Sequence, residues 1–420
     1  MSSRDYLVSL EQIGIKLGLE QIRALVAALG RPDLAYPAVV IAGTNGKGSV
    51  TAMVERGLRA AGYRTGRYTS PHLIDLEERF AVNGEPIAGA VVDALAARIE
   101  AAATALPAPP SFFEATTALA LEAFRDAGVD VAVLEVGLGG RLDATNAVSS
   151  VAVAITSVDL DHQAYLGDTL DAIAAEKAGV IKPHGLAILG DNTPVVRAVV
   201  ERVSAAQHAR LVYAPDGVTT GAVMADGRLV VTIRTPRQTY GPLPLGLRGR
   251  HQIANAVVAV RLLEELGSTD RFAIPPAAIA TALTAVTWPG RLELRSWQGH
   301  RVLLDGAHNP AGARALAAYA QEVFATRVPC VVGVMRDKHV ADILAALAPI
   351  ASCFICTAAN SPRAAAPADL AREAALVSPG TPIDTASSPL EALTRATGRG
   401  APVIVAGSLY LVGEIRAILS

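Results

Sequence analysis

The sequence is poor in cysteine and has no excess of charge of either sign. It contains only three cysteines among 420 residues, too few for a disulfide framework. Its 37 lysines and arginines nearly balance its 39 aspartates and glutamates, and the formal net charge is −2. A chain without a basic stripe or a run of like charges is not expected to bind nucleic acid or an anionic membrane surface. These absences indicate a protein of the reducing cytoplasm.

Long apolar stretches are absent as well. No run approaches the roughly 18 uncharged apolar residues of a membrane span. Residues 1–20 lack the apolar core and the small-residue cleavage site of a secretory signal. We therefore expect no membrane association and a cytoplasmic location. The chain length predicts two domains.

Two of the cysteines, Cys353 and Cys356, form a Cys-x-x-Cys pair in the apolar run "SCFICTA". A zinc site would need a second pair of ligands, and Cys330 alone could supply only one of them. We expect two small residues of a buried strand.

What the chain does contain is a series of short apolar runs without polar alternation, which is typical of strands buried on both faces of a parallel sheet. Alanine-rich helical stretches separate them, and this alternation predicts a doubly wound α/β fold that occurs twice. Residues 210–248 are alternating and turn-rich, and predict a small antiparallel patch. Pro289 and Gly290 suggest a hinge between domains at 1–288 and 289–420. The runs lie at 38–43, 129–137, 150–159, 186–190, 301–306, 329–335, 353–357 and 402–407.

The first run ends in the glycine-rich loop "GTNGKGS", residues 43–49. A strand, a glycine turn and a helix together place backbone N–H groups around an anion. Lys47 would reach the β- and γ-phosphates and the Ser49 hydroxyl a magnesium ion. The spacing differs from the common phosphate-loop pattern, because Gly48 separates Lys47 from Ser49. The alternative is a glycine-rich turn with an exposed lysine.

Acids and histidines follow the other runs, where parallel sheets bind ligands. Glu135 ends the second run, and the third run leads to Asp159, Asp161 and His162. Glu135 predicts either a salt bridge or a magnesium ion, whereas histidine is an unusual magnesium ligand. In the C-terminal part, Asp305 and His308 follow a run, and an exposed turn is their alternative interpretation. We expect the two sheet edges to face each other across a cleft.

Lys177, beside Glu176 on a helix, is a solvated surface lysine by composition alone. Residue types and spacing thus predict a two-domain protein that binds a nucleoside triphosphate and magnesium, and leave the reaction open.

A longer series of motifs narrows the range of possible reactions. The chain contains "GTNGKGS", "TSPHL", "FFEATT", "LEVGLGGRLDATN", "LDHQAYLG", "EKAGVIKP", "HQIANA", "WPGRLE", "DGAHNP" and "GSLYL" in that order. The series resembles the bifunctional dihydrofolate synthase/folylpolyglutamate synthase family of the Mur ligase superfamily. The resemblance implies a doubly wound P-loop ATPase domain of the Mur ligase type with a pterin pocket, residues 1–288, and a smaller Rossmann-like glutamate-ligase domain, residues 289–420.

The implied activity is ATP-dependent addition of L-glutamate to 7,8-dihydropteroate, to a folate, or to both. A pterin-linked carboxylate attacks the γ-phosphate of ATP, and the glutamate amine then displaces phosphate from the acyl phosphate. Such chemistry depends on positioning and charge neutralisation. Lys47, Lys177, Asp305 and His308 are the implied catalytic residues, with His308 near the transferring phosphate and the incoming glutamate. Implied ATP contacts are Gly43, Thr44, Asn45, Gly46, Lys47, Gly48, Ser49, Asn255, Arg291 and Asp305.

The resemblance also implies cofactors and a substrate pocket. Two magnesium sites and a monovalent cation are expected, and Lys177 is expected to carry a carbamate, which turns a cation into a bidentate anion. The implied metal ligands are Ser49, Ser70, Glu135, His162 and Lys177. The implied pterin residues are Leu17, Ser111, Phe113, Leu142, Asp143 and Ala144. Lys16 stands where pterin-binding relatives tend to have an acid, and Ser111 where a threonine is expected.

The expected partners are the small-molecule substrates alone, and the expected state is a monomer. The first alternative is a monofunctional folylpolyglutamate synthase. A Mur-type ligase for a nucleotide-linked precursor is disfavoured, because we expect no additional N-terminal domain for a nucleotide sugar. A P-loop switch or kinase is also disfavoured, because it needs no second α/β domain with "DGAHNP".

Overall fold

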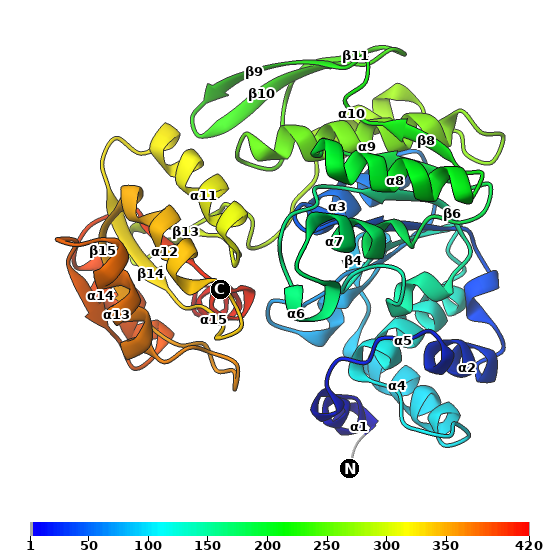
Figure 1. The fold of residues 1–420 in the computed structure, drawn as a ribbon, viewed down its shortest axis with the longest axis horizontal. Helices are drawn as coiled ribbons and strands as arrows, with labels where there is room; N and C mark the ends of the chain where they lie inside the picture. Colours follow the sequence, from blue (N-terminus) through cyan, green and yellow to red (C-terminus); the bar gives the residue numbers. More distant parts are fainter. Residues whose placement is uncertain (1–2, 420) are drawn as a thin grey trace.

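The structure, a computed structural model, describes residues 3–419 and has two lobes, each built on its own sheet (Figure 1). The N-terminal lobe comprises α1 to α10 and the C-terminal lobe β12 to α15. The predicted α/β fold is confirmed. The expected division between residues 288 and 289 falls in the segment between α10 and β12.

The first sheet has eight strands in the order β4-β3-β2-β5-β1-β6-β7-β8. Strands β2 and β5 to β8 run parallel with β1, whereas β3 and β4 pair antiparallel at one edge. The central strands are buried on both faces, as their unbroken apolar runs require. The strands are β1 Ala38–Ala42, β2 Thr65–Tyr68, β3 Phe80–Val82, β4 Glu85–Pro86, β5 Val131–Glu135, β6 Ser150–Ile155, β7 Leu186–Leu189 and β8 Arg210–Tyr213.

Helices cover both faces of this sheet. Val40 faces a core with α1, α2, α4, α5, α7 and α8, whereas Val39 faces a core with α3, α9 and α10. The helices are α1 Ser3–Ser9, α2 Glu20–Ala28, α3 Lys47–Ala60, α4 Gly89–Ala103, α5 Phe112–Asp126, α6 Gln163–Leu166, α7 Leu170–Ala178, α8 Pro194–Ala206, α9 His251–Gly267 and α10 Pro276–Thr284. Within residues 3–419, no helix combines the length and apolar character needed to cross a membrane.

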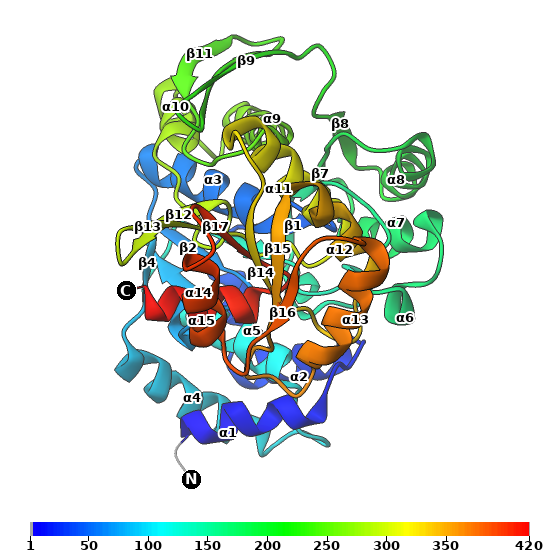
Figure 2. The same ribbon diagram turned by 90° about the vertical axis from the view of Figure 1, so that its left-hand side faces the viewer.

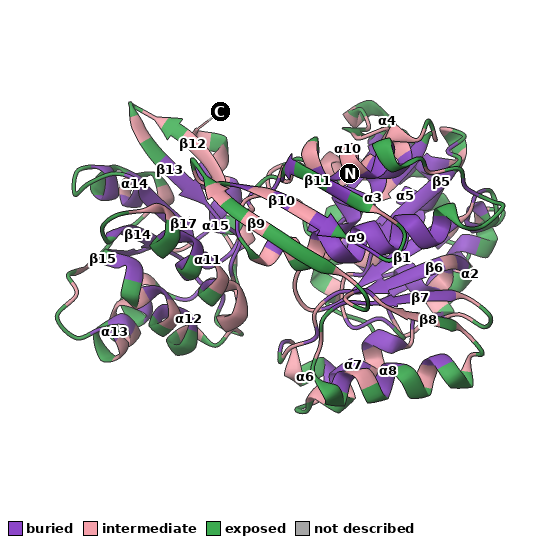
Figure 3. Cartoon of the chain, turned by 90° about the horizontal axis from the view of Figure 1, so that it is seen from above, coloured by how far each residue is buried: buried purple, intermediate pink, exposed green. Residues whose placement is uncertain are grey.

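A separate antiparallel sheet arches over the N-terminal lobe toward the C-terminal lobe (Figure 1). It consists of β9 Thr219–Ala225, β10 Arg228–Arg234 and β11 Thr239–Pro244, and β9 is largely exposed (Figure 3). At its tip, Tyr319 of the C-terminal lobe donates a hydrogen bond of 3.0 Å to the Gly227 carbonyl. The prediction of an antiparallel patch over 210–248 was wrong for 210–213, because β8 pairs parallel with β7 as the last strand of the main sheet. As the edge strand of that sheet, β8 has no fully buried residue, so it lacks the continuous apolar run of the central parallel strands.

The second sheet has the order β12-β13-β17-β14-β15-β16, parallel except for β12. Helices α11, α12 and α13 pack on one face and α14 and α15 on the other (Figure 2). Cys353 and Cys356 are buried and free in β15, as expected. The elements are β12 Glu293–Trp297, β13 His300–Leu304, α11 Pro310–Val323, β14 Val328–Val332, α12 Val340–Leu347, β15 Ala351–Cys356, α13 Pro367–Val377, β16 Ile383–Thr385, α14 Pro389–Thr397, β17 Val403–Ala406 and α15 Leu409–Ile418.

Candidate active site

The glycine-rich loop joins the end of β1 to the start of α3, at the edge of the sheet where ligands bind. At two positions of the loop, Gly43 and Gly46, a side chain larger than that of glycine would clash with neighbouring residues. Gly43 has φ +144°, and a Cβ there would lie 1.9 Å from Thr156 Oγ1. Gly46 has φ +88°, and its Cβ would lie 2.2 Å from Asn255 Oδ1. The loop leads into the N-terminus of a 14-residue helix, where an anion is stabilised.

Two lysines meet at this loop. Lys47 Nζ donates to the carbonyls of Gly43 and Thr44, both at 3.1 Å, so its side chain curls over the loop. Lys177 Nζ donates to the same Gly43 carbonyl at 2.9 Å. Burial, together with the neighbouring Lys47, lowers the pKa of Lys177 to about 7. The composition-based interpretation of Lys177 as a surface lysine was therefore wrong, because the residue is only 4% exposed.

Glu135 ends β5 beside the loop and is buried. Burial raises the pKa of its carboxyl, although Lys47 opposes the shift. The Ser70 amide donates to Glu135 Oε2 at 3.3 Å. Within the described part of the chain, no lysine or arginine nitrogen lies within salt-bridge distance of Glu135, so the salt-bridge alternative is not seen. A buried carboxylate without an ion pair is a suitable ligand for a hard cation.

His162 follows β6 with a left-handed backbone, φ +54°. Burial and the nearby Lys338 lower the pKa of its imidazole to about 4, so the ring is neutral, as metal ligation requires. Ser49 is buried in the first turn of α3. Across residues 3–419 no group of three His, Cys, Asp or Glu side chains forms a metal cluster of its own.

The C-terminal lobe contributes the end of β13. Asp305 is buried and accepts hydrogen bonds from the amides of Leu292 (2.8 Å) and Ala307 (2.9 Å). Burial raises the pKa of Asp305, against the attraction of Arg291. His308 Nδ1 lies 2.8 Å from the Gly306 carbonyl, and burial lowers the pKa of His308 to about 4. The exposed-turn interpretation of Asp305 was therefore wrong.

Arg291 and Asn255 line the joint between the lobes. A Cβ on Gly306 would lie 2.2 Å from Arg291 Nη1, so the guanidinium rests on the backbone that follows Asp305. The Asn255 amide nitrogen donates to Gln252 at 2.9 Å, which leaves its oxygen over Gly46.

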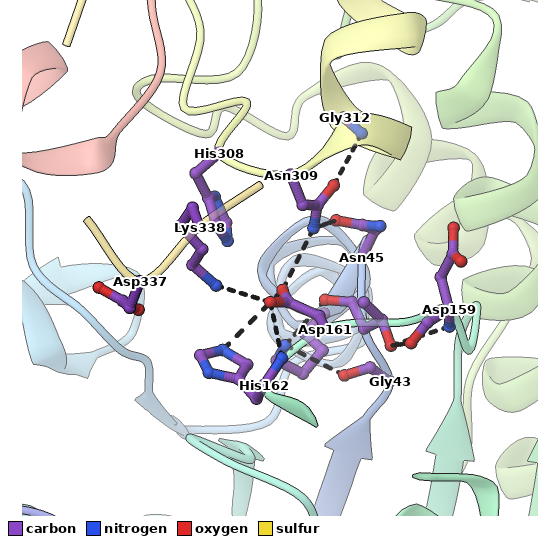
Figure 4. A network of polar contacts seen from close by, with 12 residues as sticks. Gly43, Asn45, Asp159, Asp161, His162, His308, Asn309, Gly312, Asp337 and Lys338 are labelled. Carbon is purple, nitrogen blue, oxygen red and sulfur yellow. Dashed lines mark hydrogen bonds and ion pairs between the residues drawn. The ribbon is translucent and has the colours of Figure 1, made fainter. Parts of the chain in front are cut away.

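Side chains of the two lobes meet directly at the phosphate loop (Figure 4). Asn309 Nδ2 donates to Asn45 Oδ1 at 3.0 Å and to Asp161 Oδ2 at 3.3 Å. Lys338 Nζ lies 2.6 Å from Asp161 Oδ1. Burial alone would raise the pKa of Asp161, but His162 and Lys338 hold it well below its ordinary range. The expectation that the two sheet edges face each other is confirmed.

Three residues of this bridge were given no expected role, although Asp161 is named above among the acids that follow the third run. Asp161 and Asn309 belong to quoted motifs, so their position at strand ends was a usable signal. Lys338, in the loop between β14 and α12, carries no such signal, because its partner lies 177 residues away in the sequence.

The expected pterin residues lie farther along the edge, around the start of α5 and the loop after β5. Ser111 caps α5, and its amide and hydroxyl both donate to Glu114 Oε2 at 2.8 Å. The Phe113 ring lies against Gly137, whose Cβ would be 2.5 Å from it. Asp143 is buried and accepts from the amides of Leu138 (2.8 Å) and Thr145 (3.0 Å).

The remaining expected pterin residues are Leu17 in the N-terminal segment and Leu142 and Ala144 in the loop after β5. The Gly18 amide donates to the Leu142 carbonyl at 3.4 Å, and Leu17 beside it is 42% exposed. Lys16 points to the Pro109 carbonyl at 3.2 Å.

Comparison with known families gives two matches. Residues 41–263 match the Mur ligase middle domain, and residues 290–409 match the Mur ligase glutamate ligase domain. Among related sequences, the Mycobacterium tuberculosis dihydrofolate synthase/folylpolyglutamate synthase is 39% identical over 82% of this chain and 75% of its own length. The Bacillus subtilis protein of the same name is 33% identical over 99% of this chain and 97% of its own.

A probable bifunctional folylpolyglutamate synthase/dihydropteroate synthase of Haloferax volcanii is 37% identical over 98% of this chain. The chain spans only 49% of that relative's length.

Solved structures agree over the whole chain. Mycobacterium tuberculosis folylpolyglutamate synthase complexed with ADP and AMPPCP has a TM-score of 0.92 at 35% identity, and the match covers 100% of this chain and 99% of that one. E. coli FolC in complex with DHPP and ADP has a TM-score of 0.89 at 31% identity over 100% and 97%. A bifunctional folylpolyglutamate synthase/dihydrofolate synthase with Mn, AMPPNP and L-glutamate bound has a TM-score of 0.87 at 32% identity, and the match covers 100% of this chain and 98% of that one.

Proposed function

Because the chain belongs to the dihydrofolate synthase/folylpolyglutamate synthase family of Mur ligases, we propose that it is an ATP-dependent ligase that joins L-glutamate to dihydropteroate, to a reduced folate, or to both. One observation carries this assignment beyond nucleotide binding. Asn309 and Lys338 bring the C-terminal lobe onto the phosphate loop, so a second substrate held there would lie beside the γ-phosphate. A switch or kinase has no need of that arrangement.

The reaction has two steps. An oxygen of the pterin-linked carboxylate attacks the γ-phosphorus, the bond to the bridging oxygen breaks, and ADP leaves. The glutamate amine then attacks the acyl carbon, loses a proton, and expels inorganic phosphate, which keeps one carboxylate oxygen. Both steps concentrate negative charge, which positioned cations and amides stabilise.

The loop amides, Lys47 and Ser49 would bind the triphosphate. Asn255, Arg291 and Asp305 would complete the nucleotide site from the N-terminal lobe, the joint and the C-terminal lobe, so that closure assembles it. We place the adenine base of ATP in the cavity of about 530 Å³ between α9 and α11, which is lined by Arg250, His251, Tyr319 and Glu322 among others. His251 lies one helical turn from Asn255, which favours this position.

Ser49, Ser70, Glu135 and His162 would hold magnesium, in two sites that also involve Lys177. The support is the buried Glu135 carboxylate without an ion pair. When bound, the metal would neutralise charge on the phosphates. A monovalent cation remains an expectation.

We propose that Lys177 carries a carbamate. A neutral amine adds to CO₂ and releases one proton, so the reaction requires a lysine that is readily deprotonated. Lys177 is buried, hydrogen-bonded to a carbonyl and without a carboxylate partner among the described residues, which supports this modification.

The pterin would lie near Phe113, Leu142 and Asp143, with Leu17 at its exposed edge and Ser111 and Ala144 shaping its walls. The Ser111 hydroxyl is engaged in capping α5, so we assign it a structural contribution to the pocket. We place the domain boundary between residues 288 and 289 and propose a monomeric, cytoplasmic enzyme.

ADP release by the purified protein tests the function. We expect release with 7,8-dihydropteroate or a tetrahydrofolate only when L-glutamate is also present. Release with the folate alone as acceptor would indicate a monofunctional folylpolyglutamate synthase. No release with any pterin would refute the proposal.

A further inference from the structure

Trp288, the last residue before the Pro289–Gly290 joint, lies against the phosphate loop. A Cβ on Gly48 would be 2.7 Å from the Trp288 indole nitrogen and 3.1 Å from two of its ring carbons. Gly48 lies in the first turn of α3 without a positive φ, so its backbone alone does not require glycine. The tryptophan therefore explains the glycine that separates Lys47 from Ser49.

Arg67 of β2 holds the same indole. Its guanidinium carbon lies 4.9 Å from the centre of the Trp288 ring, within cation–π range. Its Nε is buried without a hydrogen-bond partner, and no carboxylate oxygen in the described residues lies within salt-bridge distance of it. Burial lowers the pKa of Arg67, with Glu55 opposing the shift. The face of the Trp288 ring is thus the contact that the structure gives this partly buried guanidinium.

Within two residues, the contacts of the chain change from the N-terminal lobe to the C-terminal lobe. Trp288 packs on the N-terminal core with α3 and α9. Gly290, by contrast, accepts a hydrogen bond of 2.8 Å from the Gly306 amide and donates one of 2.9 Å to Glu293. The ring of Pro289 fixes its φ, and the next residue, Gly290, has a left-handed backbone with φ +69°. Arg291 follows at once.

We propose that Trp288 is a positioning residue that ties the phosphate loop to the interlobe joint. Trp288 contacts Arg67 on one side and packs on Gly48 on the other, and so it fixes the position of the backbone that carries Arg291. Nucleotide binding at the phosphate loop and the orientation of the C-terminal lobe are therefore coupled through this side chain. This role rests on the proposed nucleotide site but does not depend on which acid is ligated.

Fluorescence and nucleotide affinity test this role without the ligase reaction. The chain has two tryptophans, so a Trp297→Phe variant reports Trp288 alone. We expect its emission to change on saturation with magnesium–AMPPNP, and the emission of a Trp288→Phe variant to remain unchanged. Trp288→Ala should weaken AMPPNP binding about tenfold and Arg67→Met about threefold, whereas Trp288→Phe and Trp297→Ala should stay near the unmodified affinity.

The contact with Gly48 gives a control for unspecific damage. Gly48→Ala should weaken AMPPNP binding in the unmodified background but add little in the Trp288→Ala background, where the added methyl group has space. If the losses of AMPPNP affinity in the two single variants simply add in the double variant, or if the emission of Trp288 does not change when nucleotide binds, this inference is overturned and the proposed function is not. Failure of the unmodified protein to bind AMPPNP would overturn the proposed function and this inference together.

Discussion

Replacing Lys338 by methionine should open the two lobes without unfolding either. The methionine keeps most of the apolar stem and removes the charge that lies 2.6 Å from Asp161. The side chains of the pair are only 8% and 9% exposed, so the remaining carboxylate would stay buried without its cation. Breaking such a pair costs about 3 kcal/mol. Because the pair joins separate cores, this loss should shift the closed-to-open ratio by about a hundredfold.

A second ion pair across the same interface provides a matched control. Arg250 and Glu322 lie 2.6 Å apart, but their side chains are 53% and 27% exposed. An exposed pair contributes roughly 0.5 kcal/mol, so Arg250→Met should change the ratio about twofold.

Pulsed electron paramagnetic resonance can measure the ratio directly. The native cysteines are all buried, so cysteines introduced at the exposed Val195 of α8 and Leu376 of α13 can carry the labels. We expect Lys338→Met to broaden and lengthen the label distance, to lower turnover in parallel, and to combine less than additively with Asp161→Asn. Arg250 lines the cavity assigned to the adenine base, so the control applies to the label distance and not to turnover. A distance distribution that changes no more than in Arg250→Met would refute the bridge as the element that holds the lobes closed.

Three further predictions concern single groups. Lys177→Ala should abolish turnover, and bicarbonate or a short carboxylate should partly restore it; unchanged activity would remove the carbamate from the mechanism. Gly46→Ala should weaken AMPPNP binding in calorimetry at least tenfold, since a left-handed backbone costs about 1–2 kcal/mol and the methyl group would meet Asn255, whereas Gly62→Ala, with φ +96° and open space, should leave that affinity unchanged. Burial and Arg291 lower the pKa of His251 from 6.5 to about 4, so between these values only the unfolded chain binds the proton. The melting temperature should therefore fall as pH drops through this window, and less steeply in His251→Gln; equal slopes would contradict the assignment.

The parts of the site that the sequence predicted are those set by local backbone geometry. An apolar strand followed by glycines and a helix places the phosphate loop, and the same rule places Glu135, His162 and Asp305 at strand ends. Their neighbours along the chain determine these positions, so a short stretch of sequence carries the information.

The parts that the sequence could not supply depend on contacts between distant segments. Lys338 belongs to the site only because two lobes close on each other. The burial of Lys177 follows from α7 packing beneath the loop, and the nonapeptide "LDAIAAEKA" has no polar face that distinguishes a buried lysine from an exposed one. Gly48 is an irregularity of the loop in the sequence alone, and its cause is contact with Trp288, 240 residues away in sequence.

Isotope transfer between substrates measures the proposed chemistry most directly. Dihydropteroate whose carboxylate carries a heavy oxygen isotope is incubated with the protein, ATP and L-glutamate, and the inorganic phosphate is analysed by mass spectrometry. Ligation through an acyl phosphate predicts one heavy oxygen in the phosphate for each amide bond formed. Amide formation accompanied by unlabelled phosphate would contradict it.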